Sequence, residues 1–312
     1  MDTRDHWRQM LRASLPLAGW RTRFAPAPTG YLHLGHLVNA LHVWGVARAY
    51  GGQVLLRVED HDRTRCKPEF EAALLDDLDW LGLHADIYGT DSYRADADTH
   101  PGRQSNQSLR YELALSRLAD QGLVYACACT RRDIALVAPH APGAEPCYPG
   151  TCRDVAIPGD ATFARRVHLA PCTVPFDDLR LGHIAQQPFK QCGDVLVRDR
   201  HAQWTYQFAV VVDDMHHGID VIIRGEDLLS STARQLQLAQ LLGRTRPPTF
   251  LHHTLLVHPD GSKLSKASGD TALRELRAAG VAPATLLAEA ARRAGLSTAT
   301  SLPAAHIAEL FR

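Results

Sequence analysis

The stretch 23–36 constrains the fold of this chain more than any other, because it forces a change of backbone direction. Its two prolines, Pro26 and Pro28, fix φ and remove two N–H donors, so no helix or central strand runs through them. The segment 22–25 before them is typical of a short strand, and 34–50 after them predicts a helix that ends at two glycines. A strand, a rigid turn and a helix in this order predict the opening of an α/β domain.

The same alternation of strand and helix patterns continues along the chain. Continuous apolar runs predict strands over 53–58, 204–212, 221–223 and 249–257. Helical spacing, bounded by proline before or glycine after, predicts helices over 69–81, 107–121 and 230–242. The range 125–158 differs, because it has four cysteines, five prolines and little periodicity. We therefore expect a doubly wound, Rossmann-like α/β domain with an inserted module and a short helical C-terminal region.

These patterns divide the chain into five consecutive segments. They are an N-terminal extension (1–20), the first half of the Rossmann-like domain (21–122), an inserted module (123–198), the second half of the domain (199–262), and a loop with C-terminal helices (263–312).

Charge and hydropathy narrow the class of protein. The 34 basic and 34 acidic residues give a net charge of zero, whereas a protein coated for nucleic acid is basic overall. No apolar run reaches the roughly 18 residues of a membrane span, and the first 20 residues lack the order of a signal peptide. We expect a cytoplasmic monomer that does not contact a membrane.

Two short motifs indicate a site for a triphosphate. His33 and His36 lie three residues apart at a predicted helix N-terminus, which attracts anions, and Gly35 allows close approach. Alone, such a pair is more often two surface histidines. Much later, Lys263 and Lys266 flank Leu264 and Ser265 in a loop, where two ammonium groups can contact phosphate oxygens. The two motifs together predict ATP binding, and the missing Gly-x-x-x-x-Gly-Lys-Ser/Thr loop argues against a P-loop enzyme.

These motifs resemble the HIGH and KMSKS signatures of the class I aminoacyl-tRNA synthetases. His33-Leu34-Gly35-His36 matches the first, and Lys263-Leu264-Ser265-Lys266-Ala267 matches the second, with Leu and Ala in place of the usual Met and final Ser. Arg57-Val58-Glu59-Asp60 and Arg224-Gly225-Glu226-Asp227-Leu228 resemble motifs of the glutamate-specific branch. The resemblance covers most of the chain, from about Thr22 to Lys266.

The resemblance implies an enzyme that activates glutamate with ATP and Mg²⁺. The family's catalytic positions match His33, His36, Lys263 and Lys266. Its glutamate-binding positions match Arg23, Phe24, Ala25, Pro26, Ala27, Glu59, Tyr206 and Arg224. A substrate with two carboxylates and one ammonium needs guanidinium groups and a carboxylate, which these positions supply. Taken singly, Glu59 would pair with Arg57 or Arg63, and Tyr206 would pack in the core.

The cysteines of the irregular middle predict a structural zinc site. Cys127 and Cys129 form a Cys-x-Cys turn, and a second pair of donors follows. In the family the fourth ligand is a tyrosine, so the resemblance implies Cys127, Cys129, Tyr148 and Cys152. Cys147 is the alternative fourth ligand, because thiolates are the commoner ligands of zinc.

Only 46 residues follow Lys266, too few for an anticodon-binding domain of typical size. The chain therefore resembles the glutamyl-queuosine tRNA(Asp) synthetases, a shortened branch that activates glutamate without tRNA. That resemblance implies a tRNA(Asp) carrying queuosine as partner, with glutamate transferred to the queuosine base of the anticodon. The alternatives are a shortened ordinary glutamyl-tRNA synthetase, a glutaminyl enzyme, and a tRNA-binding synthetase relic without activity.

Overall fold

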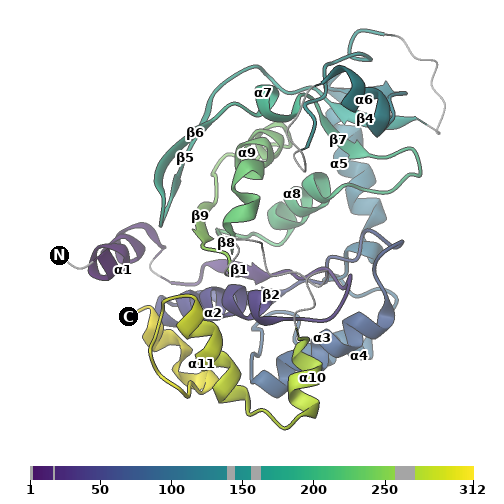
Figure 1. Ribbon diagram of the computed structural model, residues 1–312. Helices are drawn as coiled ribbons and strands as arrows, with labels where there is room; N and C mark the ends of the chain where they lie inside the picture. Colours follow the sequence, from purple (N-terminus) through teal and green to yellow (C-terminus); the bar gives the residue numbers. More distant parts are fainter. Residues whose placement is uncertain (1–2, 17, 139–144, 156–162, 257–270) are drawn as a thin grey trace.

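A parallel sheet forms the centre of the molecule (Figure 1). The computed structural model describes residues 3–16, 18–138, 145–155, 163–256 and 271–312. The strands of the parallel sheet are β1 (Arg21–Phe24), β2 (Gln53–Leu56), β8 (Val221–Gly225) and β9 (Thr249–His253). Their apolar residues are buried on both faces, as expected for parallel strands covered by helices.

The order of these strands is that of a doubly wound fold. β1 pairs in parallel with β2, and β8 with β9. β1 and β8 meet where the Asp220 N–H donates to the Arg21 carbonyl at 2.9 Å, and Ile87 adds a parallel bridge to Leu55 on the outer side of β2. The order across the sheet is therefore the Ile87 bridge, β2, β1, β8 and β9, and it reverses between β1 and β8. In folds of this type, ligands bind at the carboxyl ends of the strands where the order reverses.

Helices cover both faces of the sheet (Figure 1). On one side lie α2 (Leu34–Ala49), α3 (Pro68–Leu81), α4 (Thr90–Ala95), α10 (Leu273–Ala278), α11 (Pro283–Arg293) and the 3₁₀ segment η4 (Ala304–Leu310). On the other side lie α5 (Ser108–Asp120), α8 (Tyr206–His216) and α9 (Thr232–Leu241). The short 3₁₀ segments η1 (Gln104–Asn106) and η2 (Glu226–Ser231) precede α5 and α9, and α1 (Thr3–Ser14) lies at the N-terminal end. None of the described helices is long and apolar enough to cross a bilayer.

The inserted region has two parts. An antiparallel sheet in the order β3-β4-β7 consists of β3 (Val124–Cys127), β4 (Ala164–Val167) and β7 (Val195–Arg198), with α6 (Arg131–Val137) and α7 (Pro188–Cys192) beside it. A hairpin of β5 (Val174–Asp178) and β6 (Gly182–Gln186) instead extends the main sheet, because Asp178 pairs in parallel with Phe250 of β9. Part of the predicted insertion therefore belongs to the sheet that carries β8 and β9.

Most predicted elements are confirmed within a few residues, but one is wrong. The run 204–212 was predicted to be a strand, and the structure has helix α8 there. Five consecutive residues of this helix, 208–212, are buried, because α8 packs between α5, α9 and β7. An apolar run buried on all sides looks the same in a strand and in a buried helix, so spacing alone does not separate them.

Candidate active site

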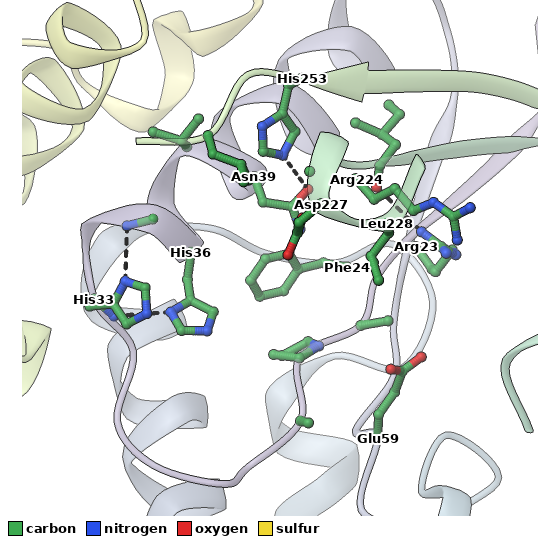
Figure 2. A pocket seen from close by; sticks show the side chains of 18 of the residues that line it. Arg23, Phe24, His33, His36, Asn39, Glu59, Arg224, Asp227, Leu228 and His253 are labelled. Carbon is green, nitrogen blue, oxygen red and sulfur yellow. Dashed lines mark hydrogen bonds between the residues drawn. The ribbon is translucent and has the colours of Figure 1, made fainter. Parts of the chain in front are cut away.

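His33 and His36 present ring nitrogens at the N-terminus of α2 (Figure 2). His33 Nδ1 accepts from the Gly35 N–H at 3.1 Å, and His36 Nδ1 accepts from the His33 N–H at 3.2 Å. Since both Nδ1 atoms accept backbone protons, each neutral ring carries its own proton on Nε2. The two rings lie 4.1 Å apart, so the helix cap itself fixes two neighbouring N–H donors.

Gly35 is needed for this arrangement. A Cβ atom at Gly35 would lie 2.9 Å from Cε1 of the His33 ring, closer than real Cβ atoms approach. The close contact that the structure shows is with the His33 ring, so the approach of a phosphate to the Gly35 backbone stays a prediction.

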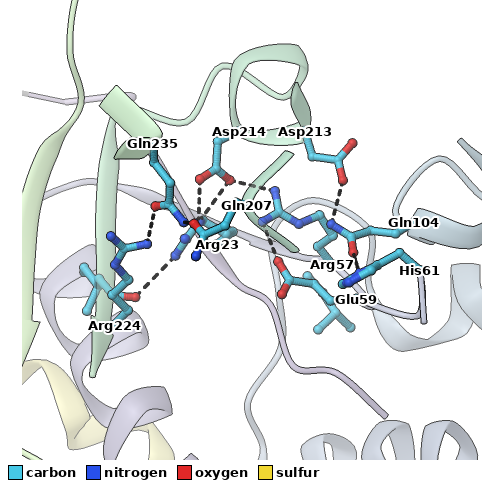
Figure 3. Close-up of polar contacts among 12 residues, drawn as sticks. Arg23, Arg57, Glu59, His61, Gln104, Gln207, Asp213, Asp214, Arg224 and Gln235 are labelled. Atoms are coloured by element: carbon cyan, nitrogen blue, oxygen red, sulfur yellow. Dashed lines mark hydrogen bonds and ion pairs between the residues drawn. The ribbon is translucent and has the colours of Figure 1, made fainter. Parts of the chain in front are cut away.

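A buried charge network lies across β1, the segment after β2 and α8 (Figure 3). Asp214 accepts from Arg23 Nε at 3.1 Å and from Arg57 Nη1 at 2.7 Å, and Arg57 Nη2 also pairs with Glu59 at 2.8 Å. Burial by itself would raise the pKa of Asp214, but the guanidinium groups of Arg23 and Arg57 lower it to about 2. The Asp214 side chain is therefore ionised at neutral pH.

One cavity of about 480 Å³ joins the two groups of residues. Its walls come from the ends of β1, β2, β8 and β9, where the strand order reverses. Eleven of the predicted positions line it, namely Arg23, Phe24, Ala25, Pro26, Ala27, His33, Gly35, His36, Glu59, Tyr206 and Arg224. The volume lies within the range of small-molecule sites.

The remaining predicted positions, Lys263, Leu264, Ser265 and Lys266, lie outside the described residues. Described residues on either side of them are near the histidines. Leu256 lines the cavity, and the Leu273 N–H donates to the carbonyl of Leu32, the residue before His33, at 2.9 Å.

Comparison with known proteins identifies the family. Residues 20–309 match the family described as tRNA synthetases class I (E and Q), catalytic domain. The chain belongs to this family. It is accordingly a ligase of the aminoacyl-tRNA synthetase type, and its α/β domain is the catalytic domain of that class.

Relatives of this synthetase confirm the predicted resemblance. The glutamyl-Q tRNA(Asp) synthetase of Cupriavidus metallidurans is 41% identical over 292 residues, which cover 90% of each chain. The glutamate–tRNA ligase 2 of Syntrophus aciditrophicus is 40% identical over 278 residues, which cover 86% of this chain and 56% of that ligase. The solved glutamate-tRNA synthetase of Elizabethkingia anophelis has a TM-score of 0.76 at 23% identity, over 94% of this chain and 66% of its own. This last likeness shows the fold.

A cluster of thiols lies in the inserted sheet of the synthetase. The sulfur atoms of Cys127, Cys129 and Cys152 all lie within 4.8 Å of one another. The Tyr148 hydroxyl lies 3.6 Å from the Cys127 sulfur, and Cys147 instead points at the Phe189 carbonyl, 3.7 Å away. The structure thus brings together the four predicted ligands and leaves Cys147 aside, and the thiol cluster is suited to a metal ion.

Sequence analysis did not find the roles of Arg57 and Asp214. Arg57 was weighed only as a partner that would occupy Glu59, whereas it also pairs with Asp214. Asp214 lies two residues after the run 204–212, which was predicted to be a strand. In a helix, Asp214 follows Tyr206 by eight residues and shares its face, so a helical interpretation would have directed both side chains to one site.

Asp214→Asn is expected to destabilise the synthetase by about 3–5 kcal/mol, because it removes the carboxylate that two buried guanidinium groups share and leaves Arg23 without an anionic partner. Since its folded pKa is depressed, wild-type Asp214 contributes stability above about pH 4 and loses it as the pH falls toward 2. Urea unfolding between pH 7 and pH 3 measures both effects.

The matched control is Asp120→Asn, at an exposed position at the end of α5. This variant should stay within about 0.5 kcal/mol of wild type and keep the same loss in acid. An Asp214→Asn protein as stable as the control would contradict the structural role of the network.

Proposed function

We propose that this synthetase activates L-glutamate with ATP, without tRNA, and transfers the glutamyl group to the queuosine base in the anticodon of tRNA(Asp). The observation that carries the proposal is the single cavity that joins paired imidazoles at a helix N-terminus to a group of guanidiniums and a carboxylate. The first suits a triphosphate and the second suits a dicarboxylic amino acid. Relatives called glutamyl-Q tRNA(Asp) synthetase, similar over 90% of both chains, support the choice of acceptor.

In the first step, a carboxylate oxygen of glutamate attacks the α-phosphorus of ATP, which gives glutamyl-adenylate and releases pyrophosphate. Mg²⁺ accompanies ATP and offsets phosphate charge. The Nε2–H groups of His33 and His36 donate to phosphate oxygens as charge develops there, together with Lys263 and Lys266. In the second step, a cyclopentene hydroxyl of queuosine attacks the activated carbonyl carbon and AMP leaves.

At the amino-acid end, we assign the substrate ammonium to Glu59 and its carboxylates to the guanidinium groups of Arg23 and Arg224, with Tyr206 beside them. Arg57 holds one oxygen of Glu59 from behind, which keeps this carboxylate oriented toward the cavity.

The deciding experiment measures glutamate-dependent pyrophosphate exchange without tRNA, then glutamylation of tRNA(Asp) with and without queuosine. We expect exchange without tRNA, and labelling only of the queuosine-containing tRNA, at the anticodon. Exchange that requires tRNA, with label on the terminal adenosine, would indicate an ordinary glutamyl-tRNA synthetase. Exchange supported by glutamine alone would indicate a glutaminyl enzyme, and no exchange would indicate an inactive relic.

His36→Asn separates the chemical role of the ring from its structural role. The asparagine oxygen can still accept the His33 N–H that Nδ1 accepts at 3.2 Å, but the Nε2–H donor is lost. We expect kcat of exchange to fall by about 100-fold with little change in unfolding temperature. His84→Asn, at an exposed position, is the control that should exchange like wild type.

We also propose one structural zinc ion held by Cys127, Cys129, Cys152 and Tyr148. The Cys129 and Cys152 sulfurs are 3.6 Å apart, close to the separation of about 3.8 Å that tetrahedral Zn–S bonds require. Arg166 supports a negatively charged ligand set, since its Nε lies 3.3 Å from the Cys127 sulfur and its guanidinium covers the Tyr148 ring.

Elemental analysis of the purified protein should find about one zinc per chain, and Cys152→Ser should remove most of it. Tyr148→Phe should release zinc to a chelator at least about tenfold faster than wild type, because one ligand is missing. Cys147→Ser should match wild type. If Cys147→Ser released zinc and Tyr148→Phe did not, the fourth ligand would be the thiolate instead.

A further inference from the structure

Arg224 is a buried guanidinium whose hydrogen-bond partners are all neutral. It is 3% exposed and lines the cavity. Its Nε donates to His252 Nε2 at 3.0 Å, its Nη1 to Gln235 Oε1 at 2.6 Å, and its Nη2 to Thr232 Oγ1 at 2.8 Å. Within the described part of the chain, no carboxylate forms an ion pair with it. Figure 3 shows it beside Gln235, away from the carboxylate that holds Arg23.

These contacts determine the tautomer of His252. A guanidinium only donates, so His252 Nε2 must accept and the ring proton sits on Nδ1. Nδ1 in turn donates to Asp178 Oδ2 at 2.7 Å. Burial lowers the pKa of His252, which keeps the ring neutral. The charge of Asp178 therefore acts on Arg224 only through an intervening imidazole.

Asp178 is held in place independently of Arg224. Its Oδ1 accepts from the backbone N–H groups of Arg180 and Leu181, each at 2.9 Å, in the turn between β5 and β6. Its Oδ2 also accepts from the His252 backbone N–H at 2.9 Å. The carboxylate thus has a fixed position, and the ring that it orients has one as well.

The guanidinium groups of Arg23 and Arg224 therefore differ in whether an anion already pairs with them. Arg23 already has an anionic partner in Asp214, whereas Arg224 has only neutral acceptors. A carboxylate ligand would supply the missing anion, and the corresponding amide would leave a buried cation unpaired, which is costly.

We infer that Asp178 and His252 are positioning residues that orient Arg224 toward the side-chain carboxylate of the amino acid, and that the neutral acceptors around Arg224 make the site select the acid over its amide. The inference rests on the proposed function, since it takes glutamate as the substrate. The β5–β6 hairpin, which belongs to the inserted region, would thereby take part in amino-acid selection.

Gln235→Glu tests the inference directly, because it is nearly isosteric and gives Arg224 its own carboxylate. We expect glutamate affinity, measured by calorimetry and as KM in exchange, to weaken by at least about tenfold. The KM for ATP should change less than threefold and the preference for glutamate over glutamine should fall. Gln240→Glu, the same substitution at an exposed position of α9, should behave like wild type.

Asp178→Asn tests the positioning role. Its oxygen can keep the turn, but its NH₂ group can donate to His252 Nδ1 and so move the ring proton to Nε2, facing Arg224. We expect a selective rise in the KM for glutamate, at least about fivefold, without loss of the folded state by circular dichroism. A merely structural role would shift both KM values together.

Two outcomes would overturn the inference, and they are distinguishable. If the wild-type protein bound no glutamate, the proposed function would fail and the inference with it. If wild type bound glutamate and Gln235→Glu bound it equally well with unchanged preference over glutamine, the inference alone would fail.

Discussion

The sharing of one buried carboxylate, Asp214, between the guanidinium groups of Arg23 and Arg57 is the contact on which the catalytic domain depends. Arg23 and Asp214 are 191 residues apart, on either side of the insertion. A buried charge without its partner costs several kcal/mol, so the two halves of the domain are strongly favoured in the one arrangement that pairs them. The cavity exists at their junction, and Glu59 is oriented in it by the same network through Arg57.

At the opposite end of the cavity, the rings of His33 and His36 both stabilise the start of α2 and present N–H donors suited to phosphate. His33 and His36 complete the cap of α2 through their Nδ1 atoms. This leaves the proton of each neutral ring on Nε2. A helix N-terminus normally needs a short polar side chain as its cap. Here the imidazoles of His33 and His36 accept the backbone N–H groups instead, so the helix is capped although its N-cap residue is not Ser, Thr, Asp or Asn.

Much of this architecture could be predicted from the chain itself, for identifiable reasons. The proline-rich turn and the glycine after α2 act locally, so the first strand, helix and strand were predicted closely. Tertiary effects were not predictable. The run 204–212 is apolar because α8 is enclosed on all sides, and spacing does not distinguish that from a buried strand. The pairing of Arg57 with Asp214 needed contacts across more than 150 residues, which no local pattern reports. The positions of Tyr148 and Cys147 relative to the thiol cluster needed the direction of each side chain, which the structure supplies.

The hairpin of β5 and β6 changes how the inserted region should be regarded by those who engineer such enzymes. An insertion of this kind could be transferred as a unit between synthetases in order to change which RNA is recognised. Here Asp178, which belongs to that insertion, contacts Arg224 in the cavity wall through His252. A chimaera cut at the ends of the insertion would therefore place foreign residues behind the cavity, whereas junctions that leave the hairpin with its original sheet would keep the cavity wall unchanged.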